Sequence, residues 1–549
     1  MIDYYDLGSH QRRVSTTSAD AQTWFDRGLV WTYGFNHEEA IRCFERAAEL
    51  DPSCAMAQWG IAYAAGPNYN KPWEAFDEED LTNSISRSHT ATSKALALAD
   101  GASAVEQALI STLPARYPSP SPDGEFSVWN DEYADAMRSV YEDHLDDLDV
   151  ASLFAEALMN RTPWGLWDLG SGLPADGAST AEAREVIEQA LATNAGREHP
   201  GVLHMYLHLM EMSPHPELAL RAADWLRDLV PDAGHLQHMP THIDVLCGHY
   251  QNVVDSNTAA VVADRVYVEQ EGAMNFYSLY RSHDYHFKLY GAMFLGQFDA
   301  AIEAANEMVR TIPGELLEVQ SPPMADWLEG FVPMRMHVLI RFGKWEEVLA
   351  SPLPDDQELF SATTAMMHYA RGVAFAATGR IDEAEAEQRS FTAAVDRVPD
   401  SRYVFNNSCI DILAIASAML DGELEYRRGN HEAAFAHLRR SIDLDDNLPY
   451  DEPWGWMQPT RHAYGALLLE QGHVEQAEAV YRADLGLDRS LPRAYQHPDN
   501  VWSLHGFHEC LTRLGKTAEA DMIKLRLDLA LARTDVEINA SCYCRLTHT

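Results

Sequence analysis

The sequence predicts an all-α protein in which helix-turn-helix repeats stack into a solenoid. Three observations predict this fold: a repeat pattern over residues 24–52, looser copies of it further along the chain, and the lack of any convincing run of alternating β-branched residues. A length of 549 residues would also allow several ordinary domains. It suits a repeat array because each added repeat packs on its neighbour and no single core has to grow.

Residues 24–52 carry the clearest repeat pattern. Its small, aromatic and proline positions have the offsets of a tetratricopeptide repeat, a helix-turn-helix unit of about 34 residues. Gly28 allows two helices to approach closely, Phe44 fills the space between them, and Pro52 stops the second helix. The pattern comprises Trp24, Gly28, Trp31, Ala40, Phe44, Ala47 and Pro52.

Looser copies extend this prediction towards the end of the chain. In each copy an apolar helix ends at a glycine, and a helix rich in Ala, Glu and Arg follows. The copies contain Gly372, Gly379 and Ala384; Gly422, Gly429 and Ala434; Gly465, Gly472 and Ala477; and Gly506, Gly515 and Ala518.

The repeats and the segments between them suggest three regions. We expect N-terminal repeats over 1–110, central repeats with long loops and a histidine cluster over 111–330, and C-terminal repeats with a tail over 331–549. Pro- and Gly-rich stretches are predicted to be long loops that cover a groove. These stretches are 113–125, 163–177, 311–324 and 484–498.

Composition narrows the classes of partner. The formal net charge of −43 argues against nucleic acid and against anionic membrane surfaces. No apolar stretch reaches the length that crosses a bilayer, and the segment Met1–Asp6 does not have the pattern of a secretory signal. The seven cysteines, an odd number spread thinly, favour reduced thiols without a disulfide framework. We therefore expect a soluble, cytoplasmic protein.

Two pairs of histidines have a spacing that is typical of metal binding. His204 and His208 are four residues apart, as are His238 and His242. On a helix this spacing places both imidazoles on one face. The two pairs are 34 residues apart, which is the repeat period. We therefore expect the four rings to face one groove from the first helices of neighbouring repeats.

A third repeat extends the histidine cluster. His204, His238 and His286 each lie ten residues before the turn of their repeat, and His283 lies one helical turn before His286. Three consecutive helices would thus present paired imidazoles, and we predict that all six converge on metal. The six predicted metal ligands are His204, His208, His238, His242, His283 and His286.

Two further histidines and the donor chemistry complete the predicted metal site. His199 and His235 are additional candidate ligands, or they cap a helix or orient a ligand. Neutral nitrogen donors suit a transition metal better than magnesium or calcium. We expect copper first, and then zinc or iron.

Two carboxylates are candidate catalytic groups. Glu211 follows His208 by three residues, so it would complete a His/carboxylate site, act as a base, or simply be a solvated carboxylate at a helix end. Glu156 lies four residues before Asn160 in an otherwise apolar helix, where polar side chains need partners if they are buried. We expect Glu156 and Asn160 to brace the histidines.

Several motifs also carry a resemblance to a known family. They are Phe35–Ala40, Cys54–Gly60, Ala157–Asn160, His199–Gly201, His235–His242, Arg461–His462 and Ala540–Cys544. From residue 7 to 546 the chain resembles a bacterial family of long tetratricopeptide-repeat proteins that share these histidine segments and a terminal Cys-x-Cys. The resemblance implies the repeat fold but no particular activity. The sequence leaves open whether His462, Cys542 and Cys544 reach the histidine cluster.

The leading functional hypothesis is a metal-dependent enzyme with a multi-histidine site, for one metal ion or two, in the groove of the repeat solenoid. In this hypothesis the enzyme is an oxidase or oxygenase that acts on a small molecule, because ligation by imidazole without committed carboxylates is typical of copper sites. A second hypothesis is a zinc-dependent hydrolase in which Glu211 or Glu156 handles protons. A third is a scaffold without catalysis that binds a peptide or protein partner in its concave groove, or binds metal alone.

Overall fold

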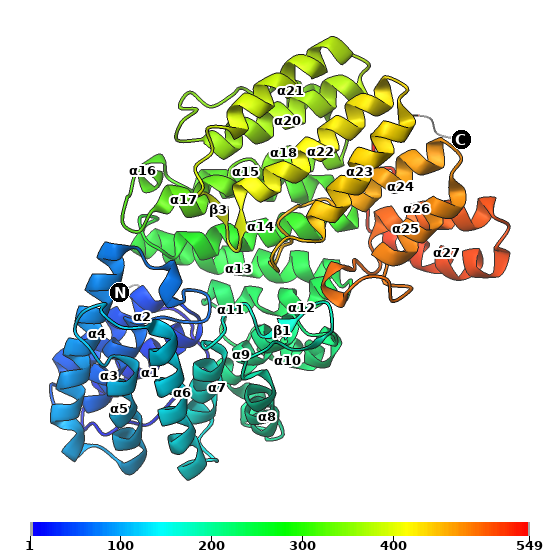
Figure 1. The fold of residues 1–549 in the computed structure, drawn as a ribbon. Helices are drawn as coiled ribbons and strands as arrows, with labels where there is room; N and C mark the ends of the chain where they lie inside the picture. Colours follow the sequence, from blue (N-terminus) through cyan, green and yellow to red (C-terminus); the bar gives the residue numbers. More distant parts are fainter. Residues whose placement is uncertain (1–3, 547–549) are drawn as a thin grey trace. The chain divides into compact units, whose positions relative to one another are not determined.

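The computed structural model describes residues 4–546 and is almost wholly helical, as the repeat pattern predicts (Figure 1). No helix in that range is both long enough and apolar enough to span a membrane. The chain forms two compact units: unit 1 comprises Met1–Ile243 and Ala259–Gly272, and unit 2 comprises Asp244–Thr258 and Ala273–Thr549. The three regions expected from repeats and loops stay a prediction.

The first unit is built from successive helices, most of them joined by short connections. Its α-helices are α1 (Ala19–Tyr33), α2 (His37–Leu50), α3 (Ala55–Ala64), α4 (Glu78–Leu98), α5 (Ala104–Arg116), α6 (Phe126–Asp143), α7 (Leu148–Met159), α8 (Thr180–Leu191), α9 (Pro200–Glu211), α10 (Leu220–Leu226) and α11 (Gly234–His238). Its 3-10 helices are η1 (Trp73–Ala75), η2 (Ala99–Gly101), η3 (Gly196–Glu198) and η4 (Pro216–Ala219). Two helices contain residues of both units: α12 (Pro240–Leu246) and α13 (Tyr250–Glu271).

The second unit continues with helices of 4 to 19 residues and two short 3-10 helices. They are α14 (Ser278–Leu295), α15 (Phe298–Thr311), α16 (Gly314–Leu317), α17 (Met324–Leu328), η5 (Glu329–Phe331), α18 (Met334–Arg341), α19 (Trp345–Ala350), α20 (Ser361–Ala377), α21 (Ile381–Val395), α22 (Cys409–Arg427), α23 (His431–Asp445), α24 (Thr460–Glu470), α25 (Val474–Asp484), η6 (Arg493–Tyr495), α26 (Val501–Arg513) and α27 (Thr517–Leu531).

Strands contribute little, as expected. β1 (Trp167–Asp168) pairs antiparallel with β2 (Leu173–Pro174), and β3 (Tyr403–Val404) pairs antiparallel with β4 (Asn407–Ser408). The first hairpin lies inside the stretch 163–177, and α16 lies inside the stretch 311–324. The 3-10 helix at 493–495 lies inside the stretch 484–498, so three of the four predicted loops contain short elements.

One aromatic ring between two glycines holds the first repeat together. Phe44 on α2 is fully buried, and its ring lies against Gly28 of α1 and Gly60 of α3. A Cβ atom would lie 2.7 Å from the ring at Gly28 and 2.5 Å from it at Gly60, which is closer than van der Waals contact allows. The glycine and the aromatic residue of the repeat pattern are therefore two halves of one contact.

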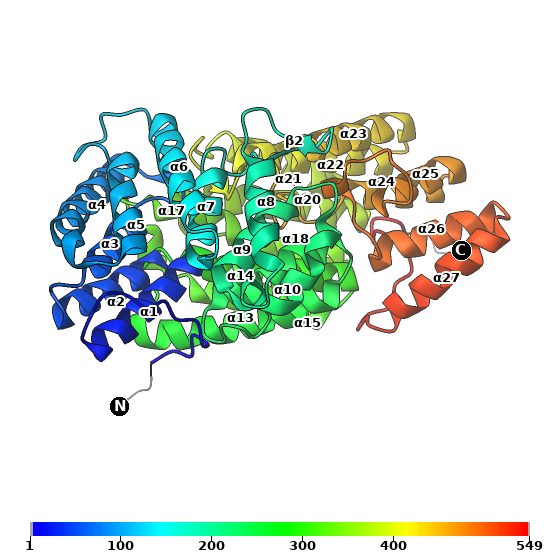
Figure 2. The same cartoon turned by 90° about the horizontal axis from the view of Figure 1, so that it is seen from below.

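Unit 2 contains four further pairs of helices that pack against each other, each with a glycine in the turn between them (Figures 1 and 2). The pairs are α20–α21, α22–α23, α24–α25 and α26–α27. The glycine of each turn has a left-handed φ, of 77° at Gly379, 82° at Gly429, 80° at Gly472 and 68° at Gly515, a conformation that residues with a Cβ seldom adopt. The copies recognised in the sequence are thus helix pairs, although Ala520 and not Ala518 is the buried alanine of the last one.

We predict that Gly60→Ala lowers the free energy of unfolding of unit 1 by about 1–3 kcal/mol, because the added methyl group overlaps the Phe44 ring. Urea unfolding followed by circular dichroism measures this as a lower midpoint at unchanged slope. The control is Gly101→Ala, since a Cβ there meets nothing within 4 Å. Equal midpoints for the two variants would contradict the packing argument.

Candidate metal centre

Helix α9 carries three of the predicted site residues into the interior of unit 1. Its start is fixed by His199, whose Nδ1 accepts a hydrogen bond from a first-turn backbone N–H at 3.2 Å, and by Pro200, which needs no partner at the first helical position. Every residue of α9 is buried. His204, His208 and Glu211 therefore face protein on all sides.

The second histidine pair lies on two short helices and not on one. Helix α11 ends at His238 and α12 begins at Pro240, because proline has no N–H to continue the hydrogen bonding of a preceding turn. The Nε2 atoms of His238 and His242 nevertheless lie 2.8 Å apart. The expected contact between these rings is present, but it forms across a break in the helix.

Three imidazoles of α9 and α11 form a tight group. One ring nitrogen from each of His204, His208 and His235 lies within 4.8 Å of the others, and all three residues are buried. Nδ1–H of His204 donates to the Tyr33 carbonyl oxygen at 2.6 Å, so the lone pair of the neutral ring is on Nε2. The Nε2 atoms of His204 and His208 are buried without a hydrogen-bond partner. A ring nitrogen that keeps its lone pair is the atom through which histidine binds a transition metal.

A single carboxylate joins the two histidine pairs. Glu211 is fully buried, and its Oε1 lies 3.0 Å from Nδ1 of His208 while its Oε2 lies 2.5 Å from Nδ1 of His242. A carboxylate only accepts hydrogen bonds, so both Nδ1 atoms carry protons and both lone pairs are on Nε2. Metal-binding histidines in proteins are commonly oriented by a carboxylate in this way. The candidate base Glu211 is thus already engaged by two imidazoles.

The pKa shifts in this cluster favour neutral rings around a charged carboxylate. Burial lowers the pKa of His204 well below its ordinary value, and the neighbouring His208 lowers it further. Burial also lowers the pKa of His208, although Glu211 opposes that change. Burial acts to raise the pKa of Glu211, but the two imidazoles outweigh burial and keep this pKa below its ordinary value. Neutral imidazoles are the form that binds metal.

Aromatic side chains that the spacing argument missed surround the cluster. The Phe35 ring lies 4.5 Å from that of His204 and stacks on that of His208, while Tyr69 and Trp164 flank His208 at 4.9 and 5.8 Å between ring centroids. Phe35 and Trp164 also have left-handed φ values of 56° and 57°, which are strained for residues with a bulky side chain. Phe35 can be noticed in the sequence, because a large aromatic residue stands in a turn where glycine or asparagine is usual.

His199 belongs to a different polar cluster. Its Nε2 lies 3.1 Å from Oδ1 of Asp149, which also faces His10 Nε2 at 3.1 Å and accepts from the Tyr33 hydroxyl at 2.7 Å. The other oxygen of Asp149 accepts from Arg12 at 2.8 Å. The guanidinium supplies the positive charge that a metal ion would bring, so this cluster fits a structural role. No spacing pattern in the sequence connects His10 with Asp149 or His199.

Glu156 is buried in unit 1 with partners of its own. Its Oε2 accepts from the Tyr63 hydroxyl at 2.6 Å, while its Oε1 has no hydrogen-bond partner. Burial raises the pKa of Glu156, and the nearby Arg116 opposes that rise. Within the described residues, Glu156 is not among the groups of ligand atoms that lie within 4.8 Å of one another. The structure therefore gives it no contact with the histidines, and its catalytic role stays a prediction.

The third histidine pair lies in unit 2. His283 and His286 are both on α14, as the spacing predicts, and both are buried. Nε2 of His286 lies 2.9 Å from the sulfur of Met457. The convergence of all six predicted ligands stays a prediction, because the two units are described separately.

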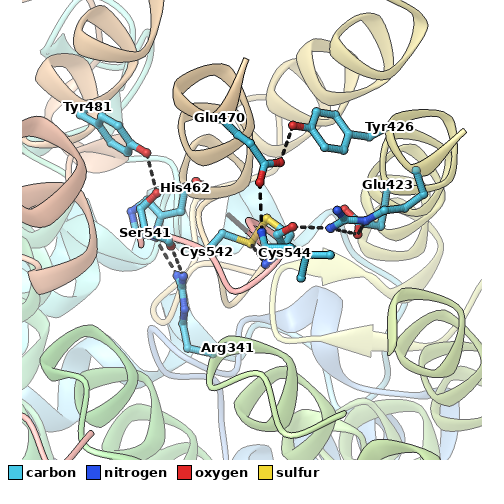
Figure 3. Close-up of a disulfide and its surroundings, with 11 residues drawn as sticks. Arg341, Glu423, Tyr426, His462, Glu470, Tyr481, Ser541, Cys542 and Cys544 are labelled. Atoms are coloured by element: carbon cyan, nitrogen blue, oxygen red, sulfur yellow. Dashed lines mark hydrogen bonds and ion pairs between the residues drawn. A yellow bond between two sulfur atoms is a disulfide. The ribbon is translucent and has the colours of Figure 1, made fainter. Parts of the chain in front are cut away.

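The terminal Cys-x-Cys differs from its expected state. Cys542 and Cys544 form a disulfide, so the expectation of reduced thiols is wrong for this pair (Figure 3). An irregular segment brings their Cα atoms to 5.2 Å, and both residues line a cavity of about 40 Å³ in unit 2. His462 lines the same cavity, but its Nδ1 accepts from Arg341 at 2.8 Å and its Nε2–H donates to Asp484 at 3.0 Å. With both nitrogens engaged, His462 is not available to a metal.

Comparisons with known proteins agree with the architecture. A tetratricopeptide repeat profile matches residues 21–54, the first helix pair. This chain is built on tetratricopeptide-like repeats. No curated protein sequence is significantly similar to it.

Solved structures match this chain over most of its length, but at low similarity. A monomeric IFIT1 mutant with Gppp-AAAA has 13% identity and a TM-score of 0.33, with 92% of this chain and 96% of that chain covered. Naa15/Naa10 bound to HypK-THB has 12% identity and a TM-score of 0.21, with coverages of 93% and 70%. The APC/C hetero-tetramer Cut9-Hcn1 has 12% identity and a TM-score of 0.28, with coverages of 94% and 94%. Because these scores are low, the fold assignment rests on the helix pairs and the matched repeat.

We predict that Asp149→Asn lowers the free energy of unfolding of unit 1 by about 3 kcal/mol at neutral pH, because buried Arg12 and two imidazoles lose a charged partner. Interactions with these groups hold the pKa of Asp149 well below its ordinary value although burial opposes them. A depressed carboxyl pKa contributes stability above the unfolded value of about 4, and this contribution is lost as the pH falls further.

Denaturant unfolding between about pH 3 and 7 tests this prediction. The gap between wild type and Asp149→Asn is full at neutral pH and narrows below about pH 4. Asp147→Asn is the matched comparison, since it removes a partly exposed carboxylate that also pairs with Arg12 but leaves the buried Asp149 in place, so its effect should be smaller. A gap that does not change with pH would contradict the assigned charge.

Proposed function

We propose that this protein is a metal-dependent enzyme whose metal is held in unit 1 by His204, His208 and His235. The observation that carries the proposal is the buried group of three ring nitrogens within 4.8 Å of one another. The Nε2 atoms of two of these rings are buried without a hydrogen-bond partner. This lowers the stability of the folded protein unless a ligand, such as a metal ion, binds these atoms. His242 and His238 lie beside this group and would supply a second set of donors.

The donor set supports a redox metal, with copper ahead of zinc and iron. Glu211 hydrogen-bonds to His208 and His242, so it is not free to bridge two ions as carboxylates do in many hydrolytic sites. Imidazole nitrogens alone suit copper, and the aromatic residues around them would keep bulk water away. We propose an oxidase or oxygenase that acts on a small molecule.

Backbone strain supports a functional cluster over a purely structural one. Phe35 and Trp164, both with left-handed φ, touch the rings of His208. Such conformations cost about 1–3 kcal/mol each and occur most often at ligand-binding and active sites.

Two other functions remain in competition with the redox proposal. A zinc-dependent hydrolase is favoured by the same three histidines, since three imidazoles are a common ligand set of catalytic zinc. A scaffold that binds a peptide or protein partner is favoured by the repeat fold itself. In a scaffold, removal of metal by a chelator would leave partner binding unchanged.

The metal itself distinguishes these functions. We predict that protein purified without an affinity tag contains stoichiometric copper by elemental analysis. Electron paramagnetic resonance should show a signal that changes on reduction, and oxygen uptake should occur with small phenols, amines or thiols. Stoichiometric zinc that supports full activity would replace the redox proposal with hydrolysis.

The ligands are tested by a second prediction. His204→Gln/His208→Gln should lose one equivalent of metal, because two of the three imidazole donors are gone, while circular dichroism should remain helical. The control is His215→Gln, since the His215 side chain is 65% exposed and pairs with Glu217 at 3.3 Å. Unchanged metal content in the double variant would remove the basis of the proposed site.

A further inference from the structure

An imidazole and a thioether sulfur are in contact inside unit 2, and a second buried imidazole packs against the residue next to that thioether. His286 is on α14, His337 is on α18, and Met457 is in the segment between α23 and α24. Nε2 of His286 lies 2.9 Å from Sδ of Met457. The His337 ring packs edge-on against Trp456, the residue before Met457, at 4.9 Å between ring centroids. All three donor residues are completely buried.

The two imidazoles are unsatisfied in a way that a bound ion would explain. Both ring nitrogens of His337 and Nδ1 of His286 are buried without a hydrogen-bond partner. A neutral imidazole has one donor and one acceptor, and leaving these groups unpaired in an apolar interior is unfavourable. The remaining nitrogen faces a thioether, which is only a weak acceptor. Most buried polar groups in proteins have a hydrogen-bond or metal partner, so a bound ion would account for these imidazole nitrogens.

The surroundings favour a soft ion of low charge. In the part of the chain that the structure describes, no carboxylate hydrogen-bonds to His286 or His337. Phe331 lies against His286 at 5.2 Å between ring centroids, and Trp456 lies against His337, so the walls are aromatic. A divalent ion in an uncharged apolar site pays a larger desolvation cost than a monovalent one. Thioether sulfur is a ligand for Cu(I), and it is a poor one for zinc.

We infer that His286, His337 and Met457 form a second metal site, inside unit 2, that binds Cu(I). This site shares no residue with the group of His204, His208 and His235, and it uses no carboxylate. It therefore stands or falls separately from the proposed enzyme site. It also assigns to His337 and Met457 a role that the histidine spacing does not indicate.

The test is a Cu(I) titration of the full chain under anaerobic conditions against a chromophoric Cu(I) chelator. Wild type, Met457→Leu and His337→Gln are compared, each also in the His204→Gln/His208→Gln background. In that background one equivalent of Cu(I) should still bind. Met457→Leu should weaken it about tenfold or more, and His337→Gln should abolish it. Met308→Leu is the control, because Met308 is an equally buried methionine of unit 2.

X-ray absorption of the copper-loaded protein provides a readout that does not depend on affinity. In the His204→Gln/His208→Gln background the spectrum should contain copper–sulfur scattering, which Met457→Leu removes and Met308→Leu keeps. Met457→Leu preserves side-chain volume, so it carries the test even if His337→Gln fails to fold.

Three outcomes would overturn the inference: spectra with nitrogen scattering only, equal Cu(I) binding by wild type and Met457→Leu, or tighter binding of Zn(II) than of Cu(I) in that background. Loss of all metal in the His204→Gln/His208→Gln background would overturn it as well. Absence of metal only at His204, His208 and His235 would instead count against the proposed enzyme site.

Discussion

The paired hydrogen bonds of the Glu211 carboxylate are the interaction on which the histidine cluster depends. A fully buried carboxylate is stable only when both of its oxygens have partners, and here each oxygen takes an imidazole N–H, one from His208 and one from His242. The same two bonds determine which nitrogen of each ring keeps its lone pair. One charged group thus connects α9 with α12 and orients two imidazoles for binding.

The repeat architecture explains how so many polar side chains can be buried together. Close contacts such as that of Phe44 with Gly28 and Gly60 bring the helix backbones near one another, so rings on adjacent helices meet across a short distance. Backbone carbonyls then serve as partners, as Tyr33 does for His204. Phe35 adopts the left-handed backbone conformation that a turn usually gives to glycine, and its side chain therefore packs against the histidine cluster. Packing and candidate function therefore use the same elements.

The two units surround their histidines in different ways. In unit 1 the imidazoles lie beside a carboxylate, whereas His286 and His337 in unit 2 lie among aromatic rings and a thioether. Burial lowers the pKa of both His286 and His337 to about 3, so these rings are neutral at physiological pH. The carboxylate beside one group and its absence from the hydrogen bonds of the other are a physical reason for the unit 2 group to favour an ion of lower charge.

The sequence by itself determined the helical repeat fold and the positions of the histidine pairs along it. Helical periodicity, turn glycines and the 34-residue separation of the pairs are local or periodic properties, and they can be recognised without coordinates. For Glu211 the sequence leaves three alternatives: part of a His/carboxylate site, a base, or a solvated carboxylate at a helix end. The break between α11 and α12 also follows from the sequence, because Pro240 cannot continue the hydrogen bonding of a preceding helix.

Only the tertiary structure decided which atoms face one another. The partners of His204 and His286 are Tyr33 and Met457, each 171 residues away in the chain. No spacing rule reaches that far, because such contacts depend on how distant helices pack and not on helical period. The same reason explains why His10, Phe35 and His337 were missed and why His199 proved to be a helix cap. Chain-local patterns set what each helix can present, and packing between helices sets what it meets.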